Sequence, residues 1–277
     1  MKLRRYMGLV GLALLLACGA GCVEIRQTIE LNEDGSGRFV EVVRLSDDLL
    51  EASKASPDFA GLLDCLSEER AKSRAKLLGE ATFVSHEVKD LGAKGREATS
   101  VYAFKDINRF TLPATPHRGG NWPTQKLTFR MGRPVLVHEA WRNAYYWRKP
   151  LTIALEPKTE TLRPAERSPS PVEREALKTL LPVLRTMLED FRVTLTLEAF
   201  GPVDGGAKTH VIFALAGSDL MREDVLMTVI EWNRYPDTWL GARGGIGAGG
   251  IIRNDNYQVG IAMPFQKTDE TTEAGKP

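Results

Sequence analysis

Cys18 and Cys22 carry the most evident chemistry in this sequence, because each thiol closes the apolar segment that follows a basic N-terminus. The apolar run from Met7 to Ala17 is too short to cross a hydrocarbon core as a helix. A basic start, a short apolar run and small residues before a cut are typical of a secretory signal peptide. The sequence therefore predicts export, with residues 1–21 holding a signal peptide that is cleaved before Cys18 or Cys22.

A thiol at such a cut can be lipidated, and the two cysteines compete for that role. Residues 15–18, Leu-Leu-Ala-Cys, resemble the bacterial lipobox, in which a Leu and a small residue before a Cys direct diacylglyceryl transfer to its sulfur. Residues 19–22, Gly-Ala-Gly-Cys, lack this Leu but place Cys22 directly before the first predicted strand, as is common in lipoproteins. Both sites stay open, as does an ordinary signal peptide with neither thiol modified. We expect an exported protein of the bacterial cell envelope, held at a membrane by its N-terminal lipid.

The composition of the mature chain excludes some classes of function. Of the 277 residues, 43% are hydrophobic and 26% are charged, which is ordinary for a globular protein. Loss of the signal peptide leaves 34 basic residues against 36 acidic ones, so no basic field favours nucleic acid as a partner. Cys65 is the one further cysteine, and it lies in an apolar helical pattern. We expect no disulfide framework and interpret Cys65 as a packing residue rather than a reactive thiol.

Motifs for catalysis and cofactors are weak. The segment 245–250 has the letters of a dinucleotide-binding fingerprint, but it follows a loop rather than a buried strand, so a flexible glycine loop is the better interpretation. The histidines have none of the spacings that place two metal ligands on one helical face; they are His86, His117, His138 and His210. The sequence therefore predicts no cofactor and no metal site, and it supplies no catalytic residue.

The most unusual local cluster is the segment 141–149, which holds four aromatic and three basic residues; it includes Trp141, Arg142, Tyr145, Tyr146 and Trp147. Such rings offer a flat amphipathic surface for a sugar, a lipid headgroup or a protein partner, and Arg can stack on them. Alternation along a strand places Trp141, Tyr145 and Trp147 on one face. Because large aromatic side chains are mostly buried, we favour a place in the core or at a strand edge, with a ligand surface as the alternative.

Periodicity and turn residues predict the elements that position these groups. A strand at 23–31, a turn at 32–37 and a strand at 38–45 form a hairpin. Ser46 starts one helix, and Ser56-Pro57-Asp58 starts another that ends near Gly79 and whose charged half we expect to be solvated. Further helices are predicted from Ser170 and from Ser218. Further strands are predicted at 82–89, 99–105, 126–130, 135–138, 151–155, 191–200 and 209–216.

Successive hairpins with helices between them predict an α+β fold, an antiparallel sheet with helices packed on one face. We divide the mature chain into an N-terminal α+β region at 22–156, a linker or long loop at 157–171 and a C-terminal α+β region at 172–265. The two regions can share one sheet, so one or two domains stay open. The tail at 266–277 is polar and is expected to be disordered.

The layout after the lipidation cysteine resembles that of the LppM-like bacterial lipoproteins. The match rests on the Asn-Glu-Asp-Gly-Ser-Gly turn at 32–37, the Ser-Asp-Asp-Leu helix start at 46–49 and the strand and turn at 195–204. The resemblance implies an envelope lipoprotein that contacts lipids, and it brings no catalytic residues. Many relatives keep a second apolar anchor near the C-terminus. The polar tail here departs from that pattern and leaves the N-terminal lipid as the one anchor identified.

These observations favour a non-catalytic binding module for a lipid-like ligand or an envelope protein partner. One alternative is an envelope hydrolase or transferase whose site assembles from dispersed residues. A second alternative is a structural assembly subunit. A deep apolar cavity would favour ligand binding, a perturbed carboxylate or His in a cleft would favour catalysis, and a large flat apolar patch would favour assembly.

Overall fold

The computed structural model describes residues 23–55, 63–113, 126–139, 144–156, 191–203, 206–216 and 257–263. Several predicted features lie outside these residues. They are the signal peptide with Cys18 and Cys22, the residues His117, Trp141 and Arg142, the linker at 157–171, the helices expected from Ser170 and Ser218, the glycine segment at 245–250 and the tail at 266–277.

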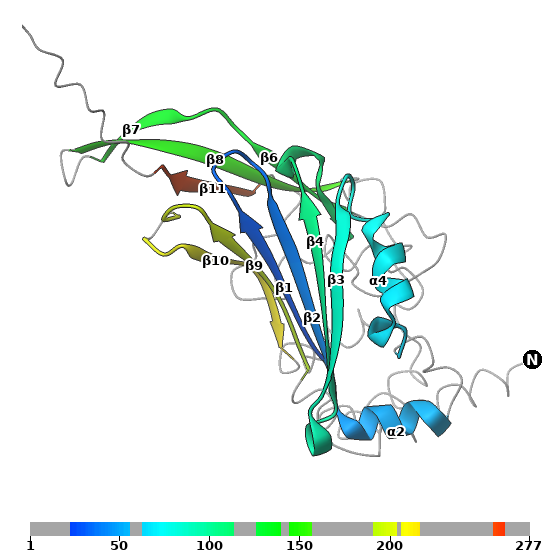
Figure 1. Cartoon of the computed structure of the whole chain (residues 1–277). Coiled ribbons are helices and arrows are strands. Elements are labelled where there is room, and N and C mark those ends of the chain that lie inside the picture. Colours follow the sequence, from blue (N-terminus) through cyan, green and yellow to red (C-terminus); the bar gives the residue numbers. More distant parts are fainter. Residues whose placement is uncertain are drawn as a thin grey trace, which may run out of the picture.

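The first of two sheets has six strands in the order β10-β9-β1-β2-β4-β3 (Figure 1). Neighbours run antiparallel, except that β1 pairs with β9 in parallel. The bounds are β1 Val23–Leu31, β2 Gly37–Leu45, β3 Thr82–Asp90, β4 Arg96–Phe104, β9 Arg192–Ala199 and β10 Thr209–Ala216. The parallel pair brings residues 192–199 beside the first described strand.

The second sheet has the order β11-β8-β6-β5, and β7 also pairs with β8. All its pairs are antiparallel. The bounds are β5 Thr111–Pro113, β6 Lys126–Met131, β7 Val135–Glu139, β8 Ala144–Glu156 and β11 Tyr257–Ala262. With 13 residues, β8 is long enough to pair with β6 along one half and with β7 along the other.

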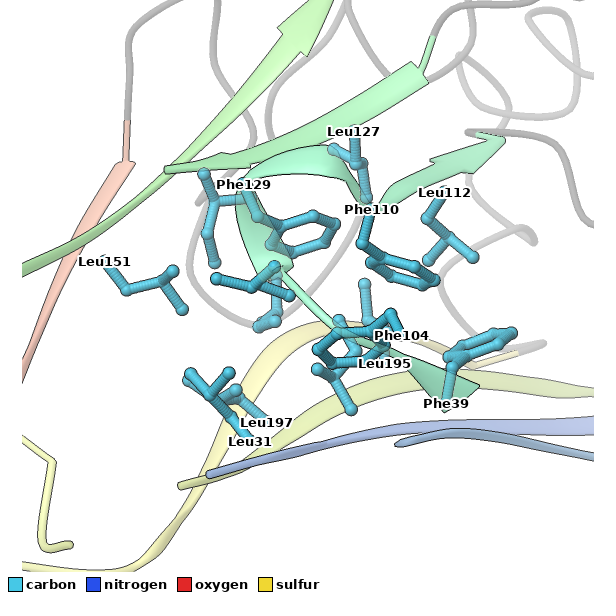
Figure 2. Close-up of a cluster of buried hydrophobic side chains, with 14 of the residues drawn as sticks. Leu31, Phe39, Phe104, Phe110, Leu112, Leu127, Phe129, Leu151, Leu195 and Leu197 are labelled. Atoms are coloured by element: carbon cyan, nitrogen blue, oxygen red, sulfur yellow. The ribbon is translucent and has the colours of Figure 1, made fainter. Parts of the chain in front are cut away.

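The main core lies between the two sheets. Figure 2 shows that side chains from both sheets meet there, and Phe110 stands at the centre of the cluster. Its ring centroid lies 4.9 Å from that of Phe104, 5.6 Å from that of Phe39 and 5.6 Å from that of Phe129. Burying each such ring contributes about 1.5–3 kcal/mol, so this aromatic stack is the main tie between the sheets.

A second, smaller cluster covers the other end of the first sheet. It joins Ile25, Val43, Leu45, Leu50 and Val193, with Cys65 and Leu66 packed at its margin. Leu50 lies in helix α2 (Asp47–Ala55), where the Ser46 hydroxyl accepts a hydrogen bond from the Leu49 amide and begins the helix as predicted. The 3-10 turn η2 (Asp64–Leu66) brings Cys65 and Leu66 over the sheet.

Helix α4 (Glu68–Ala75) lies over β3, β4 and the middle of the first sheet. Ser67 is its N-cap, with extended backbone and with its hydroxyl accepting from the Arg70 amide. The prediction of one continuous helix to Gly79 is therefore wrong at Ser67, because this cap breaks the chain direction between η2 and α4. The 3-10 turns η3 (Gly92–Lys94) and η4 (Ile107–Arg109) complete the described elements.

The predicted α+β class is wrong. The described chain is mostly strand, with α2 and α4 as its α-helices, and the main core lies between the first sheet and a second sheet rather than between a sheet and a layer of helices. Two features caused the error. The aromatic half of β8 was not assigned to a strand, and β11, whose short sequence holds a glycine, was not predicted. The strands at 23–31 and 209–216 have the predicted bounds.

Candidate functional site

Strand β7 and the first part of β8 form a two-stranded arm, defined here as residues 135–139 and 144–148. Figure 1 shows it extending past the edge of both sheets. In its register Leu136 lies opposite Trp147, and His138 lies opposite Tyr145. Residues directly opposite in an antiparallel pair point to the same side, so these four side chains form one surface, which we call the arm face.

The arm face is exposed. Tyr145 is 62% exposed and Trp147 and Leu136 are each 54% exposed, while His138 is also exposed and its ring stacks on that of Tyr145 at 4.5 Å. Of the two places favoured for Tyr145 and Trp147, the core is therefore wrong, and both rings lie on a strand of the projecting arm. Tyr146 lies on the opposite side of the arm and is half-buried. The alternative, a ligand surface, stays a prediction for these residues.

The root of the arm is fixed to the rest of the fold. The Gly132 amide donates to the Pro150 carbonyl at 2.8 Å, which closes the irregular step between β6 and β7. Lys149 Nζ donates to the Glu33 carbonyl, just beyond β1. A Cβ atom at Gly260 would lie 1.6 Å from Arg148 Nε, so the Arg148 side chain crosses β11 where that strand lacks a side chain. The arm is thus held at its base and projects from there.

A second group of polar residues was missed by the sequence analysis. Gln27, Glu41, Ser100 and His86 face one another across four adjacent strands, β1, β2, β4 and β3, and point to the covered side of the sheet. We call them the polar row. Glu41 is 4% exposed and Ser100 is 6% exposed. The row separates the two hydrophobic clusters, since Ile25 and Val43 lie on one side of it and Ile29 and Phe39 on the other.

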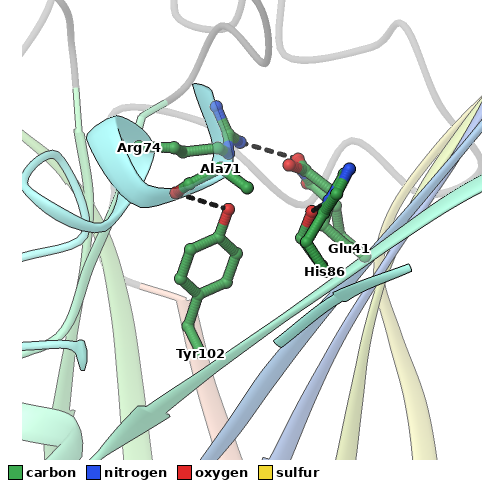
Figure 3. A network of polar contacts seen from close by, with 7 residues as sticks. Glu41, Ala71, Arg74, His86 and Tyr102 are labelled. Atoms are coloured by element: carbon green, nitrogen blue, oxygen red, sulfur yellow. Dashed lines mark hydrogen bonds and ion pairs between the residues drawn. The ribbon is translucent and has the colours of Figure 1, made fainter. Parts of the chain in front are cut away.

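Glu41 is the charged centre of the polar row. Its Oε1 accepts from Gln27 Nε2 at 2.8 Å and from Arg74 Nη2 of α4 at 2.7 Å. Tyr102, the next residue on that face of β4, donates its hydroxyl to the Ala71 carbonyl at 3.1 Å. Figure 3 shows both contacts reaching from the sheet to α4. The expectation that the charged half of this helix is solvated is wrong for Arg74, whose side chain is 11% exposed.

His86 and Ser100 form a Ser–His pair of the kind used in nucleophilic catalysis. The distance from His86 Nδ1 to Ser100 Oγ is 2.9 Å, and Nε2 lies 3.2 Å from the Leu66 carbonyl. Because that carbonyl can only accept, Nε2 carries the proton and Nδ1 accepts from the hydroxyl. Ser100 is 6% exposed, so its hydroxyl is covered on this side of the sheet. The pair therefore ties β3 and β4 to η2.

Burial also sets the chemistry of the groups around Glu41. It raises the pKa of the Cys65 thiol to about 12, and the negative charge of Glu41 adds to the effect. The same two causes raise the pKa of the Tyr102 hydroxyl to about 12. Cys65 is therefore a thiol rather than a reactive thiolate at neutral pH, which fits the packing role predicted for it.

Neither a metal site nor a membrane-spanning helix is found among the described residues. Within the described ranges, no three His, Cys, Asp or Glu side chains come close enough together to hold a metal ion. In the same ranges, neither helix has the length and apolar character needed to cross a membrane. Comparisons with protein-family models, with curated proteins and with solved structures found no match to this chain. The resemblance to the LppM-like lipoproteins therefore stays a prediction.

A sequence signal for the polar row did exist. In each of three strands, one polar residue occupies an inward position between two apolar ones: Gln27 between Ile25 and Ile29, Glu41 between Phe39 and Val43, and Ser100 between Ala98 and Tyr102. A single such residue is uninformative, because only strand pairing shows that the three lie side by side.

Proposed function

We propose that this protein is a lipid-anchored lipoprotein of the bacterial envelope that acts as a non-catalytic binding module. The anchor is the lipid predicted at Cys22 or Cys18, and the arm face is the binding surface. Its ligand is a lipid-like molecule or an envelope protein partner.

The observation that carries this proposal is the exposure of Leu136, Tyr145 and Trp147 on one side of a projecting arm. Large aromatic and aliphatic side chains gain free energy when they leave water, and grouped exposure of this kind typically marks an interaction site. Trp and Tyr are also enriched at protein and membrane interfaces, where one end of the side chain lies in an apolar environment and the other is hydrated. A binding role for the arm face follows from these properties.

The polar row supports a non-catalytic role. Its most reactive pairing, His86 with Ser100, bonds to the backbone of η2 and is covered by neighbouring elements. Glu41 bonds to Arg74 and Gln27, so its carboxylate is used within the fold. These residues stabilise the position of α4, and the arm face remains the surface that can meet a ligand.

Mass spectrometry of the mature N-terminus tests the anchor. A diacylglyceryl adduct on Cys22 or Cys18 is expected after expression in a bacterium that lipidates exported proteins. An unmodified N-terminus at another position would refute the lipoprotein part of the proposal.

Photo-crosslinking in cells tests the arm face. A photoreactive amino acid replaces Leu136 in one variant, and Val84 in the control variant. Val84 is exposed to the same extent, at 54%, but lies on β3. We expect a discrete adduct with an envelope lipid or protein from position 136 and none from position 84. Equal labelling at both positions would show that the arm face has no special role.

A further inference from the structure

The arm and the predicted anchor lie at opposite ends of the first sheet. Val23, which follows Cys22, pairs with Leu45 at the end where α2 begins. The other end of β1 leads to Glu33, whose carbonyl accepts from Lys149 at the root of the arm. The nine residues of β1 separate these points by about 26 Å. The arm extends about a further 13 Å from its root, in a direction away from α2 (Figure 1).

The segment that contains the arm, residues 130–149, differs in charge from the rest of the chain, whereas the two arm strands themselves carry one basic and one acidic residue, Arg148 and Glu139. The sequence from Arg130 to Lys149 contains five basic residues and one acidic residue, whereas the chain as a whole is almost neutral. Arg133, in the step between β6 and β7, is exposed and lies three residues before Leu136 of the arm face. Aromatic rings next to basic side chains are typical of protein surfaces that enter the headgroup region of anionic membranes.

We infer that the arm face binds an anionic lipid surface other than the one that holds the lipid at Cys22. This inference rests on the proposed function, because it assumes both the anchor and the binding role of the arm. The protein would then join two lipid surfaces, with the α2 end at one and the arm at the other.

A lipid surface fits the arm better than a peptide does. The arm is a narrow two-stranded ribbon, and its exposed group is flat, with Trp147 opposite Leu136 and Tyr145 opposite His138. Peptide recognition uses pockets for individual side chains, whereas a bilayer interface accepts rings of any arrangement at the depth of the headgroups. The net positive charge of the segment favours phosphate-bearing headgroups over neutral ones.

The first experiment measures binding without the anchor. The mature chain with Cys22→Ser is mixed with vesicles of phosphatidylglycerol and phosphatidylcholine, and with vesicles of phosphatidylcholine alone, and bound protein is measured by flotation. We expect binding to the anionic vesicles only. Tyr145→Ala combined with Trp147→Ala should weaken it at least about tenfold, and Arg133→Gln about fivefold. Val84→Ala is the matched control and should change nothing. Equal binding to both vesicle types would overturn the inference.

The second experiment measures bridging. The mature chain is coupled through Cys22 to maleimide lipid in neutral vesicles; Cys65 stays uncoupled because its thiol carries little thiolate at neutral pH. Dye-labelled anionic vesicles are then added, and their capture is measured after washing. We expect capture by the wild-type chain and loss of capture with Tyr145→Ala and Trp147→Ala. Binding in the first experiment without capture in the second would refute the two-surface arrangement.

Different results would contradict the lipid inference and the proposed function on which it rests. If an acidic peptide binds the arm face but no vesicle does, the lipid inference is wrong while the binding role of the arm stands. If mass spectrometry finds no lipid at Cys22 or Cys18, the anchor is wrong whatever the vesicles show. If neither vesicles nor the crosslinking at position 136 give a signal, the binding role itself is wrong.

Discussion

Replacing Arg74 by Met tests the role assigned to the polar row. Arg74 Nη2 lies 2.7 Å from Glu41 Oε1, and the two side chains are 11% and 4% exposed. Met keeps much of the apolar stem of Arg and removes its charge, so packing of α4 changes little. The substitution leaves the Glu41 carboxylate buried with the Gln27 amide as its remaining described donor. Removing one partner of a buried ion pair in this way typically costs about 3–5 kcal/mol of folding stability.

A double-mutant cycle separates that cost from the loss of packing. Glu41→Gln keeps an oxygen that can accept from Gln27 and Arg74 but removes the negative charge. We expect it to cost about 1–2 kcal/mol, the difference between charged and neutral hydrogen bonds. In the double variant no carboxylate is present, so removing Arg74 leaves no buried charge without a partner. The double variant should therefore be more stable than the sum of the two single changes implies, by about 1.5 kcal/mol or more.

Denaturation in guanidinium chloride, followed by circular dichroism, measures these free energies, provided that the slope with denaturant is equal among the variants. In a thermal scan, Arg74→Met should lower Tm by roughly 10 °C for a chain of this size. Lys72→Met is the matched control, because Lys72 pairs with Glu68 on the exposed side of the same helix. It should cost less than about 0.5 kcal/mol. A cost below about 1 kcal/mol for Arg74→Met, or strict additivity in the cycle, would refute the reasoning.

Three further predictions concern exposure, close packing and pH. Trp147→Ala should leave Tm almost unchanged, because the ring is exposed, whereas Phe129→Ala should cost about 3–5 kcal/mol. Gly37→Ala should destabilise the fold by several times more than Gly92→Ala in urea denaturation. A Cβ atom at Gly37 would lie 2.1 Å from a carbonyl of β1, whereas one at Gly92 meets no atom and costs only its left-handed backbone, with φ +61°. Burial raises the pKa of the Cys65 thiol in the folded state. The thiol therefore contributes its full stabilisation below about pH 9 and loses it as the pH rises toward 12. Cys65→Ala should flatten the plot of unfolding free energy against pH between these values.

Each of these has a clear contrary outcome. A large decrease in Tm of the Trp147→Ala variant would mean that this ring packs in the core. Equal effects at the two glycines would mean that β1 and β2 can separate to admit a methyl group. An alkaline stability curve that is the same with and without Cys65 would show that its thiol is as solvated in the folded state as in the unfolded one.

The predictions that succeeded rest on local physical chemistry. Alternation of apolar residues at 23–31 and at 209–216 identified β1 and β10, and the Asp-Gly and Ser-Gly pairs at 34–37 identified the turn after β1. Ser46 identified the start of α2 through its capping hydroxyl. These signals are contained within a few residues, so they require no knowledge of the rest of the chain.

The predictions that failed required distant partners. Tyr145 and Trp147 were expected in the core or at a strand edge, because aromatic rings are mostly buried. Only the end of β11 near Met263 shows that the arm continues past the sheet. The fold class failed because sequence does not show that a second sheet, rather than helices, covers the first.

By itself, the sequence determined the strands of the first sheet, the turn after β1 and the expectation of an N-terminal lipid, because hydrophobic periodicity, turn residues and the signal pattern are local properties. Tertiary structure alone decided two matters. Strand register brought Gln27, Glu41, Ser100 and His86 into one row beneath α4, and the pairing of β8 with β7 beyond the sheet exposed the aromatic face. Both depend on which strands lie side by side, and that choice is made by burial of the whole core rather than by any one segment.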